Sequence, residues 1–264
     1  MRPLRGTGPS GLTMVELLVA VSVIVVLGGL LLPAVDRSVA AARTAVCQQR
    51  LRQWAQAFAM YANANDGFYP HIDGLDRDNG PADQCGWVDV LPPLLHEKRW
   101  RDHPRYGFPG SASIFQCPSA RLTSSNDYKY NPRRDGYFSY AMNSCLELDK
   151  DCWRAPGDGG VPMPSFLRAD EVMEPARVIL LFDQLVVPKL GYDGKLMNRS
   201  AGKYCGSYPK AFSAQHRRSG SRLGGSLLYC DGHVQWVASV WKPHWPEDLE
   251  VPPRDDPDWF PYPM

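Results

Sequence analysis

The sequence lacks a charge excess of either sign. Its 264 residues contain 29 Lys and Arg against 28 Asp and Glu, which gives a formal net charge of +1. Proteins that bind nucleic acid through its phosphates carry a clear excess of basic residues, usually gathered on one face. We therefore expect no nucleic acid among the partners of this chain.

The sequence also lacks the short motifs that mark common enzyme classes. It contains no G-x-S-x-G elbow, no H-E-x-x-H helix, no phosphate-binding P-loop and no dinucleotide fingerprint. His216, His233, Asp183 and Asp231 could be combined into an acid–base site, but turn geometry already explains Asp231 and a strand position explains His233. We therefore predict that the chain is not an enzyme, and the roles of His216 and of Asp231-Gly232 stay open.

The cysteines lack metal-site spacing. There are seven of them: Cys47, Cys85, Cys117, Cys145, Cys152, Cys205 and Cys230. Neither C-x-x-C nor H-x-x-x-H occurs, and an odd set of this size in an oxidising compartment is typical of disulfides with one thiol left over. Cys145 and Cys152 are the candidate local pair, metal binding is the alternative for the set, and no cofactor is expected.

What the chain does have is one long hydrophobic run. From Leu12 to Val35 the polar side chains are Thr13, Glu16 and Ser22. As a helix, this run would measure about 36 Å, which is enough to cross the hydrocarbon core of a bilayer. A lone carboxylate in a membrane helix is costly, so Glu16 is predicted to have a partner.

Cleavage of the chain would supply that partner. A cut between Gly11 and Leu12 would leave an ammonium group on Leu12, about one helical turn from Glu16. In an array of staggered helices, Glu16 of one subunit could then pair with the Leu12 ammonium of the next. This pairing predicts an axial register for assembly, while the apolar surface supplies adhesion.

These residues resemble the class III signal of type IV prepilins and type II secretion pseudopilins. That signal is a short basic leader, Gly, an apolar residue, Thr, two apolar residues, Glu and a hydrophobic stretch. The leader here carries Arg2 and Arg5, whose charge fits a cytoplasmic leader. Pro33 falls at mature position 22, where many pilin helices carry a proline, whereas Leu12 departs from the usual Phe.

The resemblance implies a structural subunit, a pseudopilin or minor pilin, of a type II secretion or type IV pilus-like filament. A prepilin peptidase would cleave between Gly11 and Leu12 and N-methylate Leu12, and Glu16 and Pro33 would serve assembly. The partners implied are that peptidase, other pilin or pseudopilin subunits and inner-membrane lipid. The chain would span the inner membrane once, with its C-terminal domain extracytoplasmic.

A second resemblance rests on motifs that together touch most of the chain. Phe115-Gln116-Cys117-Pro118, Ser139-Tyr140-Ala141-Met142-Asn143, and His216 followed by Asp231-Gly232-His233-Val234 are similar to a large bacterial group with a prepilin-type N-terminus and an H-x9-DG C-terminal motif. Here fourteen residues, not nine, separate His216 from Asp231. The group's own biochemical role is poorly defined, so the resemblance implies membership of a pilus-like system.

Pattern and composition predict an α+β fold, in which a long N-terminal helix packs on an antiparallel sheet with long loops, a pilin-like arrangement. The expected divisions are a leader (1–11), a transmembrane or filament-core helix (12–35), its amphipathic continuation (36–65), a soluble loop-rich domain (66–240) and a proline-rich acidic tail (241–264). With 23 Gly and 24 Pro, the soluble part should be rich in loops.

Hydrophobic periodicity places the elements of the soluble part. Apolar residues from Cys47 to Tyr61 recur at intervals of four and three, so the helix should continue to about Asn63 and stop at 65–67. Strands are expected at 114–119, 137–143 and 177–183, the last with cover on both faces.

The last strands should form a hairpin over 226–237. Asp231-Gly232 predicts a two-residue type I′ turn that places Tyr229 opposite Val234 and Leu227 opposite Trp236.

One acidic loop offers an alternative function. Asp76 and Asp78 begin a stretch that resembles a calcium loop, but its twelfth position is Trp87 rather than Glu, and a solvated loop is the competing interpretation. The alternative to a filament subunit is a membrane-anchored extracytoplasmic binding module, with calcium as its candidate ligand, that does not polymerise.

Overall fold

The structure is a computed structural model. It describes residues 13–71, 86–102, 113–119, 138–143, 146, 168–183, 205–206, 212, 216–218 and 222–238. The chain divides into two compact units, 1–41 and 42–264, and the boundary falls inside the first helix.

Helix α1 (Met14–Ala64) has well-defined signals at both ends. Thr13 and Glu16 form a capping box at its start: the Thr13 N–H donates to Glu16 Oε2 (2.8 Å) and the Glu16 N–H donates to Thr13 Oγ1 (3.3 Å). At its end Gly67, at φ 86°, donates from its N–H to the Ala62 carbonyl (2.9 Å). The stop expected at 65–67 is thereby confirmed.

The first half of α1, up to Ala41, is apolar and uncovered. Between Thr13 and Ala41 no residue is buried. The Ser22 hydroxyl is satisfied within the helix, because it donates to the Leu18 carbonyl (2.7 Å). Pro33 lies inside α1 without ending it. By length and composition this helix can cross a membrane.

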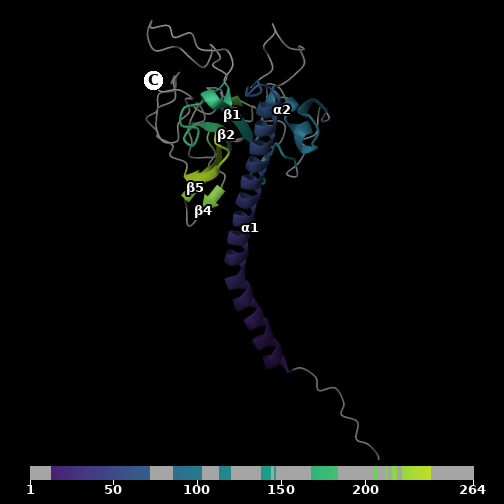
Figure 1. Cartoon of the computed structure of the whole chain (residues 1–264). Helices are drawn as coiled ribbons and strands as arrows, with labels where there is room; N and C mark the ends of the chain where they lie inside the picture. The colour runs from purple at the N-terminus through teal and green to yellow at the C-terminus, as the bar shows by residue number, and fades with distance from the viewer. Residues whose placement is uncertain are drawn as a thin grey trace, which may run out of the picture. The chain divides into compact units, whose positions relative to one another are not determined.

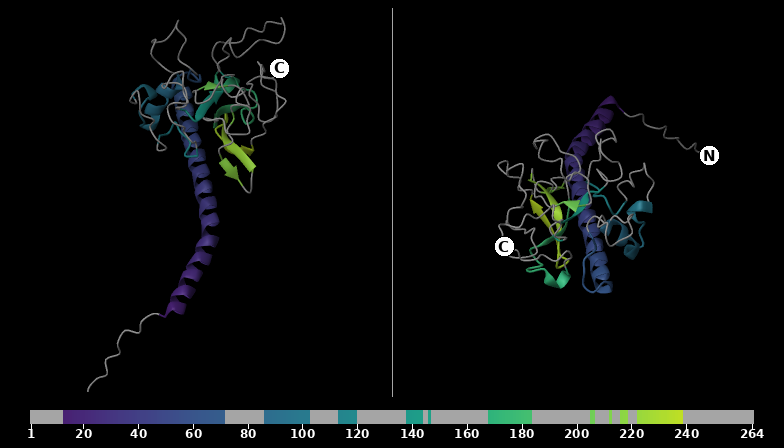
Figure 2. Two further views of the ribbon diagram at one scale, coloured as in Figure 1. Left: turned by 180° about the vertical axis from the view of Figure 1, so that it is seen from behind. Right: turned by 90° about the horizontal axis from the view of Figure 1, so that it is seen from above.

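The second half of α1, from Ala42, is amphipathic, as the spacing predicts. Its buried residues are Cys47, Leu51, Trp54, Ala57, Phe58 and Ala62. On one side of this half lies the sheet, and on the other lies the segment that contains α2 (Trp87–Val90) (Figures 1 and 2). Trp54 packs on the α2 side, with its ring centroid 5.0 Å from that of Trp87 and its indole N–H 3.3 Å from the Ile114 carbonyl.

Short helical turns surround this core. They are η1 (Pro92–Leu95), η2 (Trp100–Asp102) and η5 (Ala169–Glu171). Arg168, which precedes η5, forms an isolated β-bridge with Phe68, just after the end of α1.

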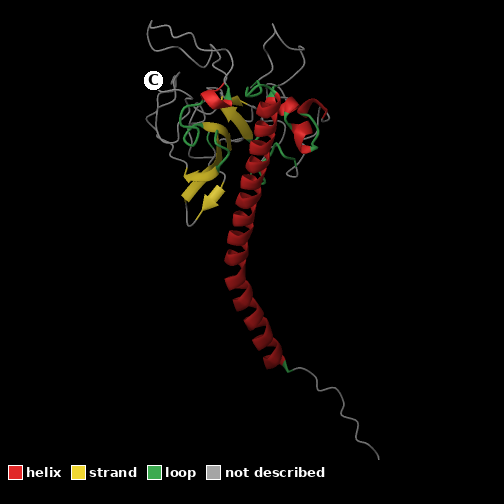
Figure 3. Cartoon of the chain, in the orientation of Figure 1, coloured by secondary structure: helices red, strands yellow, loops and turns green. Residues whose placement is uncertain are grey.

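Six strands form one sheet in the second unit (Figure 3). They are β1 (Tyr140–Asn143), β2 (Ile179–Asp183), β3 (Cys205–Gly206), β4 (His216–Arg218), β5 (Arg222–Tyr229) and β6 (Val234–Ala238). The order is β3-β1-β2-β5-β4, with β6 also paired to β5. All pairs are antiparallel except β1 with β3, which is parallel. The long helix and the mainly antiparallel sheet make the fold α+β.

Strand β5 has partners on both edges. Residue Leu228 pairs with both Leu181 of β2 and Val234 of β6, so these two strands lie on opposite edges. Gly224 pairs with His216 of β4 and with Ala238 of β6. Strands β2 and β4 therefore share one edge of β5, and this arrangement brings the end of β2 near the start of β4.

Strand β2 is buried along its whole length, as its unbroken apolar run predicts. Leu181 joins the large core beneath α1, whereas Ile179 and Phe182 join a smaller apolar cluster with Leu227 and Tyr229. The sheet is thus covered on both faces at this strand.

The strand expected at 114–119 is wrong. Residues 113–119 form turns, with the Gln116 N–H donating to the Ser113 carbonyl (3.2 Å). The segment joins the start of β1 by isolated bonds, such as that from the Ser139 N–H to the Phe115 carbonyl (3.0 Å), rather than by a ladder. Pro118 has no N–H to donate to a neighbouring strand, so it limits strand pairing in this segment. The apolar run by itself indicates burial, not strand pairing.

The hairpin forms, but its predicted register is wrong by one residue. Leu228 pairs with Val234 and Ser226 with Trp236. Gly232 is the one residue of the turn with positive φ, and its N–H donates to the Tyr229 carbonyl (2.9 Å). This corresponds to a longer loop ending in a left-handed glycine instead of a type I′ turn, which needs two positive φ values. The slip moves each side chain of β6 to the other face of the sheet.

Candidate functional site

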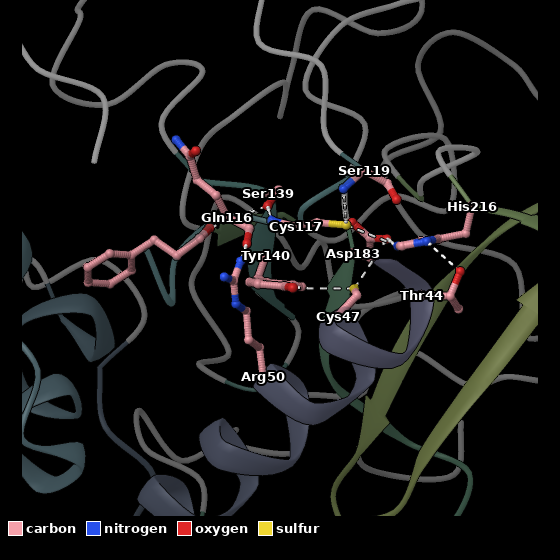
Figure 4. Close-up of polar contacts among 11 residues, drawn as sticks. Thr44, Cys47, Arg50, Gln116, Cys117, Ser119, Ser139, Tyr140, Asp183 and His216 are labelled. Atoms are coloured by element: carbon pink, nitrogen blue, oxygen red, sulfur yellow. Dashed lines mark hydrogen bonds and ion pairs between the residues drawn. The ribbon is translucent and has the colours of Figure 1, made fainter. Parts of the chain in front are cut away.

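Four buried side chains from four separate segments meet beside the second half of α1 (Figure 4). Cys47 comes from α1, Cys117 from the turn 113–119, Asp183 from the last position of β2 and His216 from the first position of β4. We call these residues the Cys–His–Asp cluster. Each is at most 1% exposed, and one ligand atom of each lies within 4.8 Å of the other three.

The cluster converges on one nitrogen of His216. Its Nε2 lies 3.0 Å from Cys117 Sγ and 3.0 Å from Asp183 Oδ2. Cys47 Sγ lies 3.8 Å from the same Asp183 oxygen. Two sulfurs, one carboxylate oxygen and one imidazole nitrogen therefore face a common point.

The other nitrogen of His216 is held from outside the cluster. His216 Nδ1 and Thr44 Oγ1 are 3.0 Å apart, and Thr44 lies one turn before Cys47 on α1. This contact orients the imidazole ring so that Nε2 points at the sulfurs and the carboxylate (Figure 4). Because Thr44 contacts Nδ1, Nε2 is the ring nitrogen that remains for the other groups of the cluster.

Both sulfurs accept hydrogen bonds from their surroundings. The Tyr140 hydroxyl donates to Cys47 Sγ (3.3 Å), and the Ser119 N–H donates to Cys117 Sγ (3.4 Å). Donors of this kind stabilise sulfur that carries negative charge. Each sulfur thus has a hydrogen-bond donor beside it, and its surroundings are not purely apolar.

The turn that carries Cys117 is fixed on two sides. The Cys117 N–H donates to the Ser139 hydroxyl, just before β1, and the Arg50 guanidinium donates to the Gln116 carbonyl. Because Arg50 lies on α1 three residues after Cys47, the helix positions both cysteines of the cluster.

Asp183 is satisfied on one side only. Its Oδ2 faces His216 and Cys47, whereas its Oδ1 has no hydrogen-bond partner among the described residues. Burying a carboxylate oxygen without a partner is unfavourable, since the group has lost its water.

Burial and mutual contacts shift the pKa values of the cluster. Burial raises the pKa of Asp183 to about 7. Burial opposes the charge of His216, but its hydrogen bonds to Asp183 and Cys117 outweigh this and raise its pKa to about 10. Burial raises the pKa of Cys47, whereas contacts with Cys47 and His216 outweigh burial at Cys117 and lower its pKa. The arrangement favours a Cys117 thiolate beside a His216 imidazolium.

The geometry differs from that of a nucleophilic triad. In a triad, the acid binds one imidazole nitrogen and the nucleophile the other. Here Cys117 and Asp183 face the same nitrogen, and Thr44 takes the second. The four groups are also fully buried, so the arrangement suits the binding of a small ion better than attack on a substrate.

Comparison with known proteins gave no family model, no curated protein and no solved structure that matches this chain. The site must therefore be interpreted from its own chemistry.

The residues predicted from the sequence fall into two groups. Glu16 and Pro33 lie in the described part of α1, where Glu16 accepts hydrogen bonds from Thr13. The others lie outside the described residues: the processing pair Gly11 and Leu12, the disulfide candidates Cys145 and Cys152, the calcium candidates Asp76 and Asp78, and the tail 241–264. Among the described cysteines, Cys47, Cys117 and Cys230 carry free thiols.

The four groups considered for acid–base chemistry do not form one site. Asp183 and His216 meet in the cluster. Asp231 and His233 lie in the exposed hairpin turn, where Asp231 Oδ1 lies 2.6 Å from His233 Nδ1 and accepts the His233 N–H (3.0 Å). The strand position expected for His233 is wrong, because the longer loop delays the start of β6 to Val234. The structural interpretation of Asp231 as a turn residue is consistent with these contacts.

Sequence reasoning missed the cluster as a unit, although two of its members left a signal. Cys47 begins the buried face of α1, and Asp183 places a carboxylate at the end of a fully buried strand. A carboxylate in that position needs a partner, which was the available clue. The spacing rules for metal sites did not help because no two members are close in the sequence.

Proposed function

We propose that the chain is a structural subunit, a pseudopilin or minor pilin, of a type II secretion or type IV pilus-like filament. A prepilin peptidase cleaves it between Gly11 and Leu12 and methylates the new Leu12 amino group. The first half of α1 inserts in the inner membrane and then joins the filament core, with the second unit extracytoplasmic.

One observation carries the proposal. The first half of α1 is an apolar helix long enough to cross a membrane, and none of its described residues is buried. A soluble protein does not leave this much apolar surface uncovered, because exposed patches of this size mark membrane or protein contacts. The same helix runs on as an amphipathic element that belongs to the core of an α+β unit.

The hydrogen bonds of Glu16 offer a competing explanation for why a Glu occurs at this position, namely that it caps the helix. In the uncleaved chain, its carboxylate accepts hydrogen bonds from the Thr13 N–H and hydroxyl at 2.8 and 2.9 Å. A capping box alone would account for a Glu at this position. The proposal instead gives the negative charge a role in meeting the Leu12 ammonium of a neighbouring subunit.

Three variants separate the cap from the charge. Glu16→Gln keeps the capping geometry and removes the charge, Thr13→Ala weakens the cap and keeps the charge, and Glu16→Ala removes both. The proposal expects Glu16→Gln and Glu16→Ala to lose filament incorporation while Thr13→Ala retains it. All three should still insert in the membrane, which carbonate extraction and protease protection measure.

The matching measurement on the wild-type chain is mass spectrometry of its mature N-terminus. The proposal requires a chain that begins at methylated Leu12. A chain that still begins at Met1, or variants of Glu16 that assemble normally, would contradict it and favour a membrane-anchored binding module that does not polymerise.

A further inference from the structure

We infer that the Cys–His–Asp cluster of Cys47, Cys117, Asp183 and His216 is a structural zinc site. It would fasten the second half of α1 to the sheet through four protein ligands. This inference concerns the second unit alone, so it does not depend on the proposed filament function.

The donor set fits zinc in kind and in number. Zinc is bound in proteins by cysteine sulfur, histidine nitrogen and aspartate oxygen, and its structural sites have four such ligands in a tetrahedral arrangement. Calcium and magnesium prefer sites made wholly of oxygen, which two sulfurs and an imidazole do not offer. The cluster supplies two sulfurs, one nitrogen and one carboxylate, all from buried side chains.

The distances also fit. Ligands placed tetrahedrally at zinc bond lengths are separated by roughly 3.3–3.8 Å. His216 Nε2 lies 3.0 Å from both Cys117 Sγ and Asp183 Oδ2, Cys47 Sγ lies 3.8 Å from Asp183 Oδ2, and all four atoms lie within 4.8 Å of one another. The two 3.0 Å contacts would have to lengthen by about 0.3–0.5 Å, and the widest separation, up to 4.8 Å, would have to close by about 1 Å, for the ion to sit at the centre.

The surrounding contacts are those expected around a bound metal. A zinc-binding histidine usually donates its second N–H to a fixed acceptor, and Thr44 Oγ1 lies 3.0 Å from His216 Nδ1. The Tyr140 hydroxyl and the Ser119 N–H reach the two sulfurs. Two thiolates and a carboxylate carry three negative charges, zinc supplies two positive ones, and these donors offset the remaining charge.

Asp183 provides the independent observation. It is fully buried, and its Oδ1 has no hydrogen-bond partner among the described residues. A cation between the four groups adds positive charge beside this carboxylate, whose charged contact among the described residues is His216 on the Oδ2 side. A Cys47–Cys117 disulfide is the competing use of the two thiols, and it would leave the Asp183–His216 pair buried beside it with Asp183 Oδ1 still unpartnered.

The deciding experiment uses the full-length chain purified in detergent. Elemental analysis should find about one zinc ion per chain, and replacement by cobalt should give the absorption bands of a tetrahedral thiolate complex. Removal of zinc by a chelator should lower the thermal midpoint by about 5 °C or more. These readouts use the wild-type chain, so they hold even where a variant fails to fold.

Matched variants assign the ligands. Cys47→Ser, Asp183→Asn and His216→Gln should each lose zinc, whereas Cys230→Ser and His233→Gln, which change the same residue types outside the cluster, should retain it. Thr44→Val should keep the fold and weaken zinc affinity about 10-fold, because Thr44 orients His216 without touching the ion.

Two results would overturn the inference. One is a wild-type chain that takes up neither zinc nor cobalt after reduction and exposure to the free ions. The other is a non-reduced peptide map in which Cys47 and Cys117 are joined by a disulfide. Either result leaves the filament proposal standing, because that proposal is tested by the N-terminus and by Glu16.

Discussion

The two halves of α1 have the same secondary structure and opposite surroundings. From Thr13 to Ala41 no residue is buried, whereas the half from Ala42 to Ala64 buries six side chains in the core of the second unit. The difference shows that helix formation alone says little about what a helix is for. In the first half the apolar residues surround the helix, and in the second they follow a single face.

The largest effect expected from this comparison is at Trp54. Trp54→Ala should lower the free energy of unfolding of the second unit by about 3–5 kcal/mol, because it removes a fully buried ring packed on Trp87 and Phe115. The matched change Ile24→Ala, in the first half, should alter it by less than about 0.5 kcal/mol. Denaturant unfolding of both variants in detergent measures the difference, and equal effects would show that the two halves are not energetically distinct.

The glycines of the two regions give the next effect. A Cβ on Gly224 would lie 2.2 Å from the Val237 carbonyl oxygen and 2.5 Å from the Trp236 ring, so Gly224→Ala should destabilise the second unit by about 1–3 kcal/mol. A Cβ on Gly28 would meet nothing within 4 Å, so Gly28→Ala should leave that stability unchanged. Thermal unfolding followed by near-UV circular dichroism tests both, and a tolerated Gly224→Ala would contradict the close approach of β5 and β6.

The smallest effect concerns a single hydrogen bond from β1 to Cys47 in the buried half of α1. Tyr140→Phe keeps the ring in the core and removes the donor to Cys47 Sγ, so it should cost about 1 kcal/mol. Tyr61→Phe, which makes the same change at a half-buried tyrosine of α1, is the control. Urea unfolding with matched slopes resolves this difference, and a stabilising Tyr140→Phe would argue that the sulfur needs no donor.

Much of the fold could be predicted because its signals are local. The sequence Asn65-Asp66-Gly67 predicts the end of α1, and Asp66 and Gly67 both adopt positive φ there. The burial of β2 follows from its unbroken apolar run, and β1 lies within the aromatic stretch that predicts it. In each case a few neighbouring residues are enough to predict the element.

The hairpin register and the cluster could not be predicted for the same reason. The register depends on how many residues the loop around Gly232 uses, and Asp-Gly is compatible with more than one loop length. The cluster depends on β2 and β4 sharing an edge of β5, which no local pattern contains. Each member also has a local explanation of its own, such as the place of Cys47 on the apolar face of α1.

The pairing of Thr44 with His216 has a consequence for how the chain matures. The two residues are 172 positions apart, so the contact that orients the imidazole ring can form only after most of the second unit has been synthesised. Contacts of such long range close late and slowly, since the intervening chain must first be brought together. A chain released before His216 would leave Asp183 without its partner, so truncated copies would be exposed to proteases during biogenesis.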